Sequence, residues 1–423
     1  MRDLAAAAWQ SDDRERWRKV LVLLAGRLAA QDKATDQGLL WLKRLWAALG
    51  GAKARPPVQR FQDVRLAALT YQSMGGRVAF AASDLNLEAE IEQPLRQALT
   101  ALLAAPDAAV PPADRLIAGH VLGDLGDLRY PVSDAEWQAS LTQRSTALTS
   151  AGDHYWRYVP AGDYRIGGWD GDEAAVHTLA AFWIARLPIT VAQFARFVQA
   201  GYDDDAHWTP HGLAWHDNRT VPSLWGDPRY SAPNQPVVRI TWYEATAFCH
   251  WLTTRLLTEW VIRLPTEAEW EAAAAFAGPV ERRAYPWGPE EPTPERAVYN
   301  AWKLAAPAPV GLCPAGATAS GALDMAGNVW EWVSSSYKAY PAGAHQAEKD
   351  FTPYEGDVPL RGHAYYSGIT DVHCGARSKP HPEGGISSRG FRVVVSPLLA
   401  QMSCFLHAES YADKRKCKAF SRS

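Results

Sequence analysis

The residues with the clearest chemical potential lie in one tract near the C-terminus, residues 361–397, which reads RGHAYYSGITDVHCGARSKPHPEGGISSRGFRVVVSP. Asp371, His373 and Cys374 stand close together there, and these are the residue types of a thiol nucleophile with its base. Adjacent residues of an extended segment point to opposite faces, so His373 is badly placed to take the proton of Cys374. A free cysteine usually behaves as a small hydrophobic residue, so we expect Cys374 to be buried and unreactive.

The composition narrows the classes of function. The 423 residues are 47% hydrophobic, which is enough for two folded domains. A formal net charge of -3, with 43 basic and 46 acidic side chains, gives no overall field, so we expect neither a nucleic-acid nor a membrane partner. Five widely spaced cysteines show no zinc-site spacing, and no apolar stretch suits a signal peptide or a membrane span. These features predict reduced thiols and a cytoplasmic protein.

The first 150 residues are predicted to form a separate helical domain. Glycine and proline punctuation divides them into about five or six helices. Residues 114–132, DRLIAGHVLGDLGDLRYPV, resemble the HEAT-like arrays of some bacterial STAND-type NTPases, although the chain has no GxxxxGK[ST] phosphate loop. We expect this domain to act as a spacer or as a docking platform for an effector. One apolar helix face is formed by Trp17, Val20, Leu21, Leu24 and Leu28.

After residue 150 the pattern changes to short strands, turns and aromatic residues, as in WRYVPAGDYRIGG and QPVVRITWYEA. Helices are predicted after Thr190, from Trp242 to Leu257, and after Thr266. Thr266 is followed three residues later by Glu269, which is the spacing of a capping box. The second part therefore reads as an irregular α+β domain.

A series of short motifs in this part closely resembles the formylglycine-generating-enzyme (sulfatase-modifying-factor) family. The resemblance runs from about Trp156 to Ser396. It implies an α+β, C-type-lectin-like domain over residues 151–423, preceded by the all-α helical domain of residues 1–150. The motifs are RLPTEAEWEAAA (263–274), YPWG (285–288), YNAW (299–302), DMAGNVWEWVSS (324–335), LRG (360–362), ARS (376–378) and GFRVV (390–394).

The enzymes of this family, by resemblance, oxidise a substrate cysteine with a cysteine pair that follows the LRG motif. Those positions fall near Tyr366 and Ile369, whose side chains can neither bind copper(I) nor exchange disulfides. The iron-dependent sulfoxide synthases with this fold carry an HxxxHxE ligand set in a helical domain, whereas His120 stands alone here. We therefore expect that the chain is not an enzyme and requires no cofactor.

The family also binds calcium through the GNxWEW segment, with side-chain and backbone oxygens of the kind that a hard cation prefers. The resemblance implies a structural calcium site, and a hydrogen-bonded turn without metal is the alternative. The matching positions are Asp324, Gly327, Val329 and Glu331.

The tract resembles most the variable proteins of diversity-generating retroelements, in which fixed scaffold residues alternate with positions rewritten from asparagine codons. The variable region would span about residues 361–392. Lys379, Glu383 and His363 depart from that pattern. The resemblance implies that ligand contacts come from Tyr365, Tyr366, Ser367, Gly368, Thr370, Asp371, His373, Ala376, Ser378, His381, Gly384, Ile386, Ser387, Ser388 and Arg389.

Tyrosine, serine and glycine dominate binding surfaces of the antibody kind, because tyrosine provides rigid contact area and the small residues adapt. We therefore expect a ligand-binding protein that displays a diversified surface to an unknown protein or other macromolecule. Two alternatives remain open: an oxidase or other enzyme on the same fold, and an adaptor or effector subunit of a STAND-type signalling or conflict system.

Overall fold

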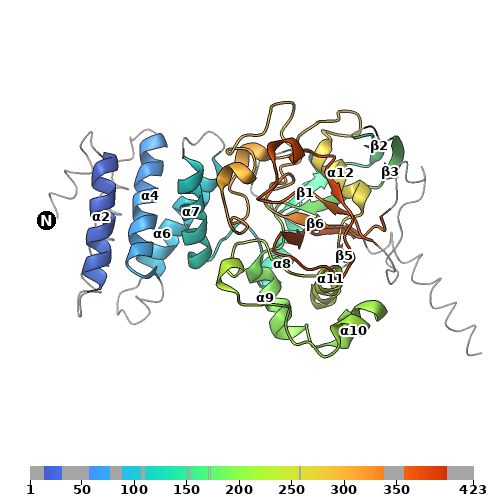
Figure 1. The fold of residues 1–423 in the computed structure, drawn as a ribbon, viewed down its shortest axis with the longest axis horizontal. Coiled ribbons are helices and arrows are strands. Elements are labelled where there is room, and N and C mark those ends of the chain that lie inside the picture. The colour runs from blue at the N-terminus through green and yellow to red at the C-terminus, as the bar shows by residue number, and fades with distance from the viewer. Residues whose placement is uncertain are drawn as a thin grey trace, which may run out of the picture.

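The computed structural model describes residues 14–30, 57–76, 88–105, 110–149, 152, 154–169, 171, 173–256, 259–337 and 357–397. A row of helices at the N-terminal end leads into a larger part that mixes short strands, helices and loops (Figure 1). The predicted α+β class is confirmed. Within these ranges, no helix has both the length and the apolar character needed to cross a membrane.

The α-helices before residue 126 lie side by side and bury their apolar faces against each other (Figure 1). On α6 the buried side chains Leu95, Leu99 and Leu102 recur at the helical spacing that places them on one face. In chain order the elements are α2 (Arg14–Ala29), α4 (Pro57–Ser73), the π-helical turn η1 (Glu88–Glu92), α6 (Gln93–Ala104), α7 (Pro112–Leu125) and α8 (Asp134–Thr142).

Helix α7 joins the helical row to the rest of the chain through a shared core. A side chain at Gly123 would clash, since its Cβ would lie 2.3 Å from Asn234 Oδ1. Asn234 in turn donates a 2.7 Å hydrogen bond to the Gly119 carbonyl. The buried Arg129 donates to the carbonyl oxygens of Val310 and Gly311 at 2.9 and 3.1 Å. These contacts leave little freedom between the two parts.

Helix α8 falls inside the predicted helical domain but packs with the second part. Its Trp137 lies edge-on to Tyr155, with ring centroids 5.4 Å apart, and also packs against Trp156. A capping box at Ser133 fixes where the helix begins.

The described strands of the second part form two small sheets and a hairpin. Strand β10 lies between β4 and β5 in a sheet of order β1-β4-β10-β5, and β2 pairs with β3. The other sheet has the order β8-β7-β6-β9, in which β6 and β9 are parallel. The strands are β1 (Trp156–Val159), β2 (Gly162–Gly167), β3 (Ala174–Leu179), β4 (Phe182–Ala185), β5 (Trp260–Arg263), β6 (Trp330–Trp332), β7 (Leu360–Arg361), β8 (Arg377–Ser378), β9 (Arg389–Phe391) and β10 (Val394–Pro397).

The predicted helices of this part are confirmed, and one of them supports the tract. Thr266 accepts a hydrogen bond from the Glu269 backbone, and the Glu269 side chain accepts one in return, so the predicted capping box is present. The longer helix is described from Trp242 to Leu256, and its predicted last residue, Leu257, lies outside the described residues. The helices are α9 (Val191–Ala200), α10 (Pro210–His216), α11 (Trp242–Leu256) and α12 (Glu267–Ala275), with short 3-10 turns at Asp205–His207, Pro228–Tyr230, Asn300–Trp302, Pro314–Gly316 and Ile369–Asp371.

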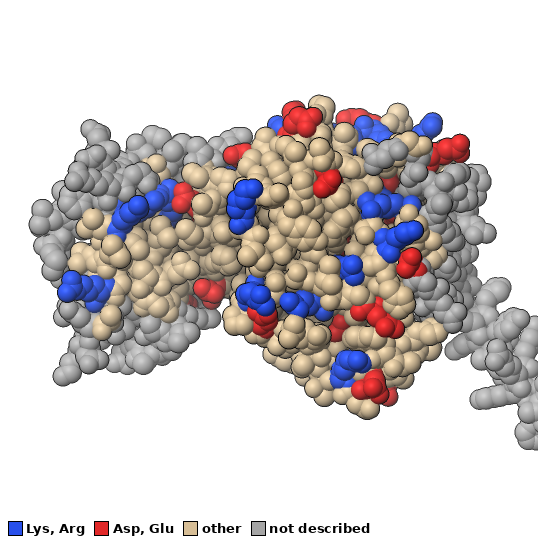
Figure 2. All heavy atoms as spheres, in the orientation of Figure 1, with Lys and Arg blue, Asp and Glu red and all other residues tan. Residues whose placement is uncertain are grey.

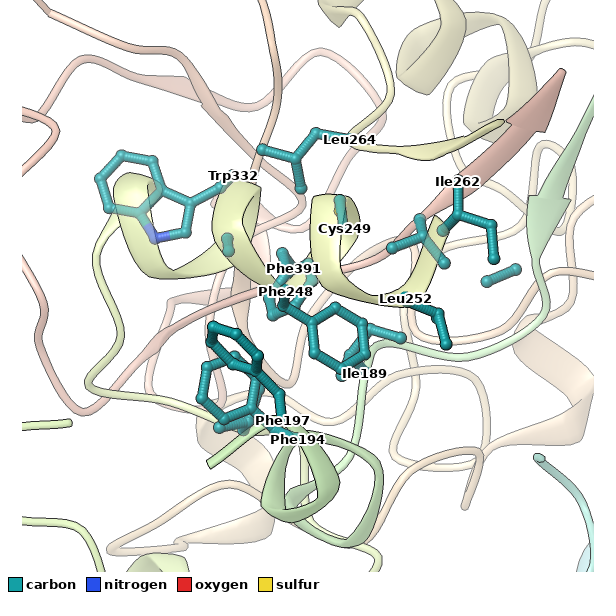
Figure 3. Packing of buried hydrophobic residues seen from close by; sticks show 14 of the residues in the cluster. Ile189, Phe194, Phe197, Phe248, Cys249, Leu252, Ile262, Leu264, Trp332 and Phe391 are labelled. Atoms are coloured by element: carbon teal, nitrogen blue, oxygen red, sulfur yellow. The ribbon is translucent and has the colours of Figure 1, made fainter. Parts of the chain in front are cut away.

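Aromatic side chains dominate the core of this part (Figure 3). Phe194 stacks on Phe248 at 5.5 Å, and Phe391 meets Phe248 edge-on at the same distance. Phe391 belongs to strand β9, which lies near the end of the tract. The end of the tract is therefore anchored in the core, while the residues before it reach the surface.

Candidate functional site

Buried carboxylates of α12 fix the backbone of the tract. Arg361, which is fully buried, forms ion pairs with Glu267 at 3.1 Å and with Glu271 at 2.7 Å. It also donates a 3.0 Å hydrogen bond to the carbonyl oxygen of Cys374. Arg377 binds the Glu267 carboxylate from the other end of the same loop. Breaking a buried pair of this kind costs about 3–5 kcal/mol, so these residues form a rigid frame.

A second buried ion pair holds the end of the tract. The Arg392 guanidinium binds both carboxylate oxygens of Glu331, at 2.6 and 2.7 Å, and Trp270 Nε1 donates to the same carboxylate at 2.7 Å. Arg392 also donates to the backbone carbonyls of Leu323 and Ala185. Glu331 thus balances the charge of the Arg392 guanidinium, and the two carbonyls accept further hydrogen bonds from it. The role of Arg392 is therefore structural.

Cys374 is fully buried, as predicted. Its Sγ lies 3.5 Å from the Ala274 carbonyl oxygen, and burial raises the pKa of the thiol far above its usual range. The Nδ1 atom of His373 accepts a hydrogen bond from the Gly375 backbone, so it does not serve the thiol. Cys249 and Cys313 are also buried free thiols, whereas Cys404 and Cys417 lie outside the described residues.

The predicted contact residues divide by exposure. Tyr366 is 50% exposed and Ile386 is 43% exposed, and Thr370, Asp371 and His381 are exposed as well. Ile369 is 48% exposed, although it is not among the predicted contact residues. By resemblance, it falls only near a position of the family's cysteine pair. The partly exposed members of the predicted set are Gly368, His373, Ser378, Gly384, Ser387 and Arg389.

Four predicted contact residues are buried: Tyr365, Ser367, Ala376 and Ser388. The Tyr365 ring packs in the same core cluster as the N-terminal helices, and its hydroxyl donates to the Ala305 carbonyl. The Ser367 hydroxyl accepts from the Ala364 backbone, and the Ser388 hydroxyl lies 3.2 Å from that of Tyr366. In the described conformation these side chains support the surface from beneath.

Two histidines and two tryptophans form an aromatic cluster at one side of the tract. The His363 ring lies 4.3 Å from Trp330 and 6.0 Å from His373, which in turn lies 6.0 Å from Trp169. His363 has a φ of 63°, a left-handed conformation that is uncommon for a residue with a side chain. Burial and the neighbouring His373 lower the pKa of His363 to about 4. A neutral imidazole at this position can accept a hydrogen bond from a ligand or donate one to it.

Trp169 and Trp330 were not among the sequence-predicted site residues. Trp330 lies in the WEW motif, and its pairing with Arg389 across the parallel strands β6 and β9 brings it beside the tract. Trp169 follows β2, and its Nε1 donates a 2.8 Å hydrogen bond to Glu271. No local sequence signal connects residue 169 to residue 373, because only the fold brings them together.

The positions implied for calcium do not fit that ion as they lie. Both oxygens of Glu331 are engaged by Arg392, and Asp324 accepts a 2.7 Å hydrogen bond from the Gly311 backbone. Burial raises the pKa of Asp324, which disfavours its charged form. In the part of the chain that the structure describes, no group of three or more His, Cys, Asp and Glu side chains is arranged to hold a metal.

The chain matches relatives that are named as enzymes. It is 38% identical over 181 residues to a hercynine oxygenase of Mycolicibacterium thermoresistibile, covering 40% of this chain and 39% of that protein. It is 30% identical over 294 residues to a formylglycine-generating enzyme of Thermomonospora curvata, covering 57% of this chain and 93% of that enzyme. The chain thus spans less than half of the length of the hercynine oxygenases that it matches.

These relatives contradict the prediction that the chain is not an enzyme. That prediction rested on the missing cysteines near Tyr366 and Ile369. Their absence removes only the chemistry that needs thiols at those positions, and it does not exclude a reaction that uses other groups of the same surface. The relatives' names therefore keep an enzymatic function open.

Among solved structures, the chain is similar to Treponema denticola variable protein 1, with a TM-score of 0.44 and 19% identity, covering 57% of this chain and 95% of that one. The model of the sulfatase-modifying factor enzyme 1-like domain matches residues 143–397, which is more than half of the chain. The match of the family model confirms the predicted family. The chain belongs to the sulfatase-modifying factor family, whose domain here carries a row of helices at its N-terminal end.

Proposed function

We propose that the chain is a recognition protein whose variable region, residues 361–392 of the tract, displays ligand contacts on a rigid lectin-like frame, in the manner of the variable proteins of diversity-generating retroelements. The observation that carries the proposal is the division of the tract into two sets. Arg361, Cys374 and Phe391 are fully buried, while Tyr366, Ile369 and Ile386 are 50%, 48% and 43% exposed. A fixed backbone with exposed side chains is what a binding surface needs.

Tyr366 illustrates how the frame prepares a contact. Its ring meets Tyr365 edge-on at 5.2 Å, and its hydroxyl lies 3.2 Å from that of Ser388. The two buried residues hold the exposed ring in one orientation, so little side-chain entropy is lost when a ligand binds. Preorganised tyrosines of this kind are frequent hot spots of protein recognition.

The proposed ligand is a protein or another macromolecule, and the contact is local rather than driven by overall charge. Figure 2 shows basic and acidic side chains interspersed on one face of the molecule. The helical row is a proposed docking platform for an effector, in a reducing cytoplasm that suits the buried free thiols Cys249, Cys313 and Cys374.

Sequencing the 3′ end of the gene in related isolates tests the proposal. We expect substitutions to concentrate at exposed positions such as Tyr366, Thr370 and Ile386, while Arg361 and Phe391 stay constant. A nearby reverse-transcriptase gene with an asparagine-rich near-copy of the tract is also expected. Invariance at the exposed positions, with no such copy, would contradict the proposal.

A second candidate function is enzymatic. Two observations favour it: the rings of His363 and His373 lie close together, and several relatives are named as enzymes. The test is to incubate the purified chain with hercynine and oxygen, and separately with a cysteine-containing sulfatase peptide, each with iron or copper added. Turnover that is lost in His363→Ala and His373→Ala, and kept in the exposed control His381→Ala, would establish this candidate. Absence of turnover under both conditions would count against it.

A further inference from the structure

Two arginines flank the loop of residues 384–388, and one of them comes from outside the tract. The backbone N–H groups of Arg239 and Arg389 both donate to the carbonyl oxygen of Ile386, each at 3.1 Å. Gly385 lets the two segments approach, since a Cβ there would lie 2.7 Å from the Arg239 carbonyl oxygen. The loop is thus held between the two arginines, and residues 227–239 become a neighbour of the proposed recognition surface.

Neither guanidinium forms an ion pair with a carboxylate among the residues that the structure describes. Arg239 lies over the Tyr230 ring at 4.8 Å, and Arg389 lies 5.8 Å from the centre of the Trp332 ring and donates to the Gly384 carbonyl. The Nε atoms of both arginines are buried without a hydrogen-bond partner. In contrast, Arg361, Arg377 and Arg392, which fix the frame of the tract, each form an ion pair with a glutamate.

Neither arginine forms an ion pair with Asp227, Asp371 or Glu383, although hydrogen bonds from Arg229 and, to a smaller extent, the charge of Arg239 lower the pKa of Asp227. Asp227 is taken by Arg229, with a 2.8 Å contact between Nη2 and Oδ2. Asp371 of the tract accepts a 3.0 Å hydrogen bond from the Gly368 backbone. Glu383 is exposed and forms no ion pair with a described residue.

The backbone of Arg239 is strained. Its φ is 64°, a left-handed conformation that costs free energy for a residue with a side chain.

From this geometry we infer that the recognition surface extends onto Tyr230 and Arg239, and that it binds an acidic peptide segment of a partner protein. Arg239 and Arg389 would bind the carboxylates, because a guanidinium matches a carboxylate in both charge and shape. The exposed side chains of Tyr366 and Ile386 would contact apolar groups between the acidic residues. The inference rests on the proposed recognition function and specifies its ligand.

A peptide is a better match than a nucleic acid for this arrangement. Tight binding to nucleic acid needs many phosphate contacts along a basic stripe, whereas this surface offers two arginines without an ion pair, with Asp227 and Glu383 close by in the sequence. Charge complementarity therefore favours a short acidic segment with an apolar side chain.

The test is a selection of random peptides displayed on phage, carried out on the full chain. We expect selected peptides to be enriched in Asp and Glu beside an aromatic or aliphatic residue. A synthetic peptide from that pool should lose about tenfold or more in affinity for Arg239→Met and for Arg389→Met, as expected when a charge-assisted hydrogen bond is removed. Changing the acidic residues of the peptide to amides should give the same loss.

Arg165→Met, on strand β2, is the matched control, because Arg165 is an exposed arginine outside this surface. A similar loss for Arg165→Met would contradict the inference, since it would indicate unspecific charge attraction. Peptides that depend on Tyr366 and Ile386 but lack acidic residues would contradict it too and would leave the recognition function standing. If no selected peptide depends on Tyr366 or Ile386, the recognition function itself fails. Preferential, arginine-dependent binding of single-stranded DNA would replace the acidic peptide with a phosphate ligand.

Discussion

His363 combines a left-handed backbone, a ring packed on Trp330, and a second histidine beside it. A left-handed residue other than glycine or asparagine costs free energy, and such strain tends to gather at functional positions. The side chain at this position must therefore be stabilised by its contacts. Its titration is the property of the site that can be measured most directly.

The lowered pKa of His363, about 4 against an ordinary 6.5, predicts a stability change with pH. Between these two values the unfolded chain binds a proton that the folded chain does not bind. Stability should therefore fall as the pH drops from 6.5 towards 4 and should not respond to this group above about pH 7. The expected loss is about 2 kcal/mol, after allowance for partial exposure.

Urea unfolding of wild-type protein and His363→Asn at pH 4.5 and 7 measures this effect. Asparagine tolerates the left-handed conformation and does not titrate, so the variant should show a smaller difference between the two pH values. His381→Asn, at an exposed position of the same tract, should behave as the wild type does. Equal pH dependence in wild type and His363→Asn would show that His363 titrates normally.

The Arg392–Glu331 pair leads to a prediction about calcium. Because the guanidinium already occupies both oxygens of Glu331, we expect calcium or a chelator to leave the melting temperature unchanged. Arg392→Met should destabilise the fold by about 3–5 kcal/mol, since it leaves a buried carboxylate unpaired. Arg389→Met, at the partly exposed start of strand β9, should cost less. A clear rise of the melting temperature with calcium in the wild type would mean that Glu331 exchanges its partner for the ion.

At the scale of the elements, α12 is the support on which the tract rests. Glu271 accepts hydrogen bonds from the Gly167 backbone at 3.0 Å and from Trp169 at 2.8 Å, and it pairs with Arg361 at 2.7 Å. One carboxylate thus joins α12, the end of β2 and strand β7. The aromatic cluster and the frame of the tract depend on the same group.

Glu271→Ala should therefore destabilise the protein by about 3–5 kcal/mol and loosen the tract, because it leaves the buried Arg361 without one of its carboxylates. Denaturant unfolding measures the first effect, and hydrogen exchange of residues 361–378 measures the second. Glu281→Ala is the control, since the Glu281 side chain is 65% exposed and its pair with Arg283 lies at the surface. If both variants lose the same stability, α12 does not anchor the tract.

The sequence predicted the elements better than it predicted which side chains face the ligand. The capping box at Thr266 and the burial of Cys374 follow from local patterns, and both are present in the structure. The burial of Tyr365 does not, because it depends on helices that lie far away in the chain. The neighbourhood of Arg239 and Arg389 is likewise a product of the fold, since no periodicity relates positions so distant in sequence.

At the scale of the whole molecule, the helical row and the second part of the chain are joined by a shared buried core. The buried cluster of the helices includes Val298 and Leu312 of the second part. Arg115 of α7 donates a hydrogen bond to the Leu312 carbonyl of the second part, and Asn234 of the second part donates one to the Gly119 carbonyl of α7. An effector docked on the helices would therefore be connected to the tract through packed contacts, of which the buried Tyr365 ring is one.

This arrangement predicts that the two parts unfold together in a single thermal transition, and that a side chain added at their junction separates them. Gly123→Val places its Cβ about where the Asn234 side chain lies, since even an alanine Cβ there would be 2.3 Å from Asn234 Oδ1. We expect calorimetry to show two transitions for this variant, the lower one from the helical row. Ala101→Val adds bulk at an exposed position of α6 and should keep one transition. Two transitions in the wild type would instead mean that the helical row folds independently, and the proposed link between a docked effector and the tract would then lose its physical basis.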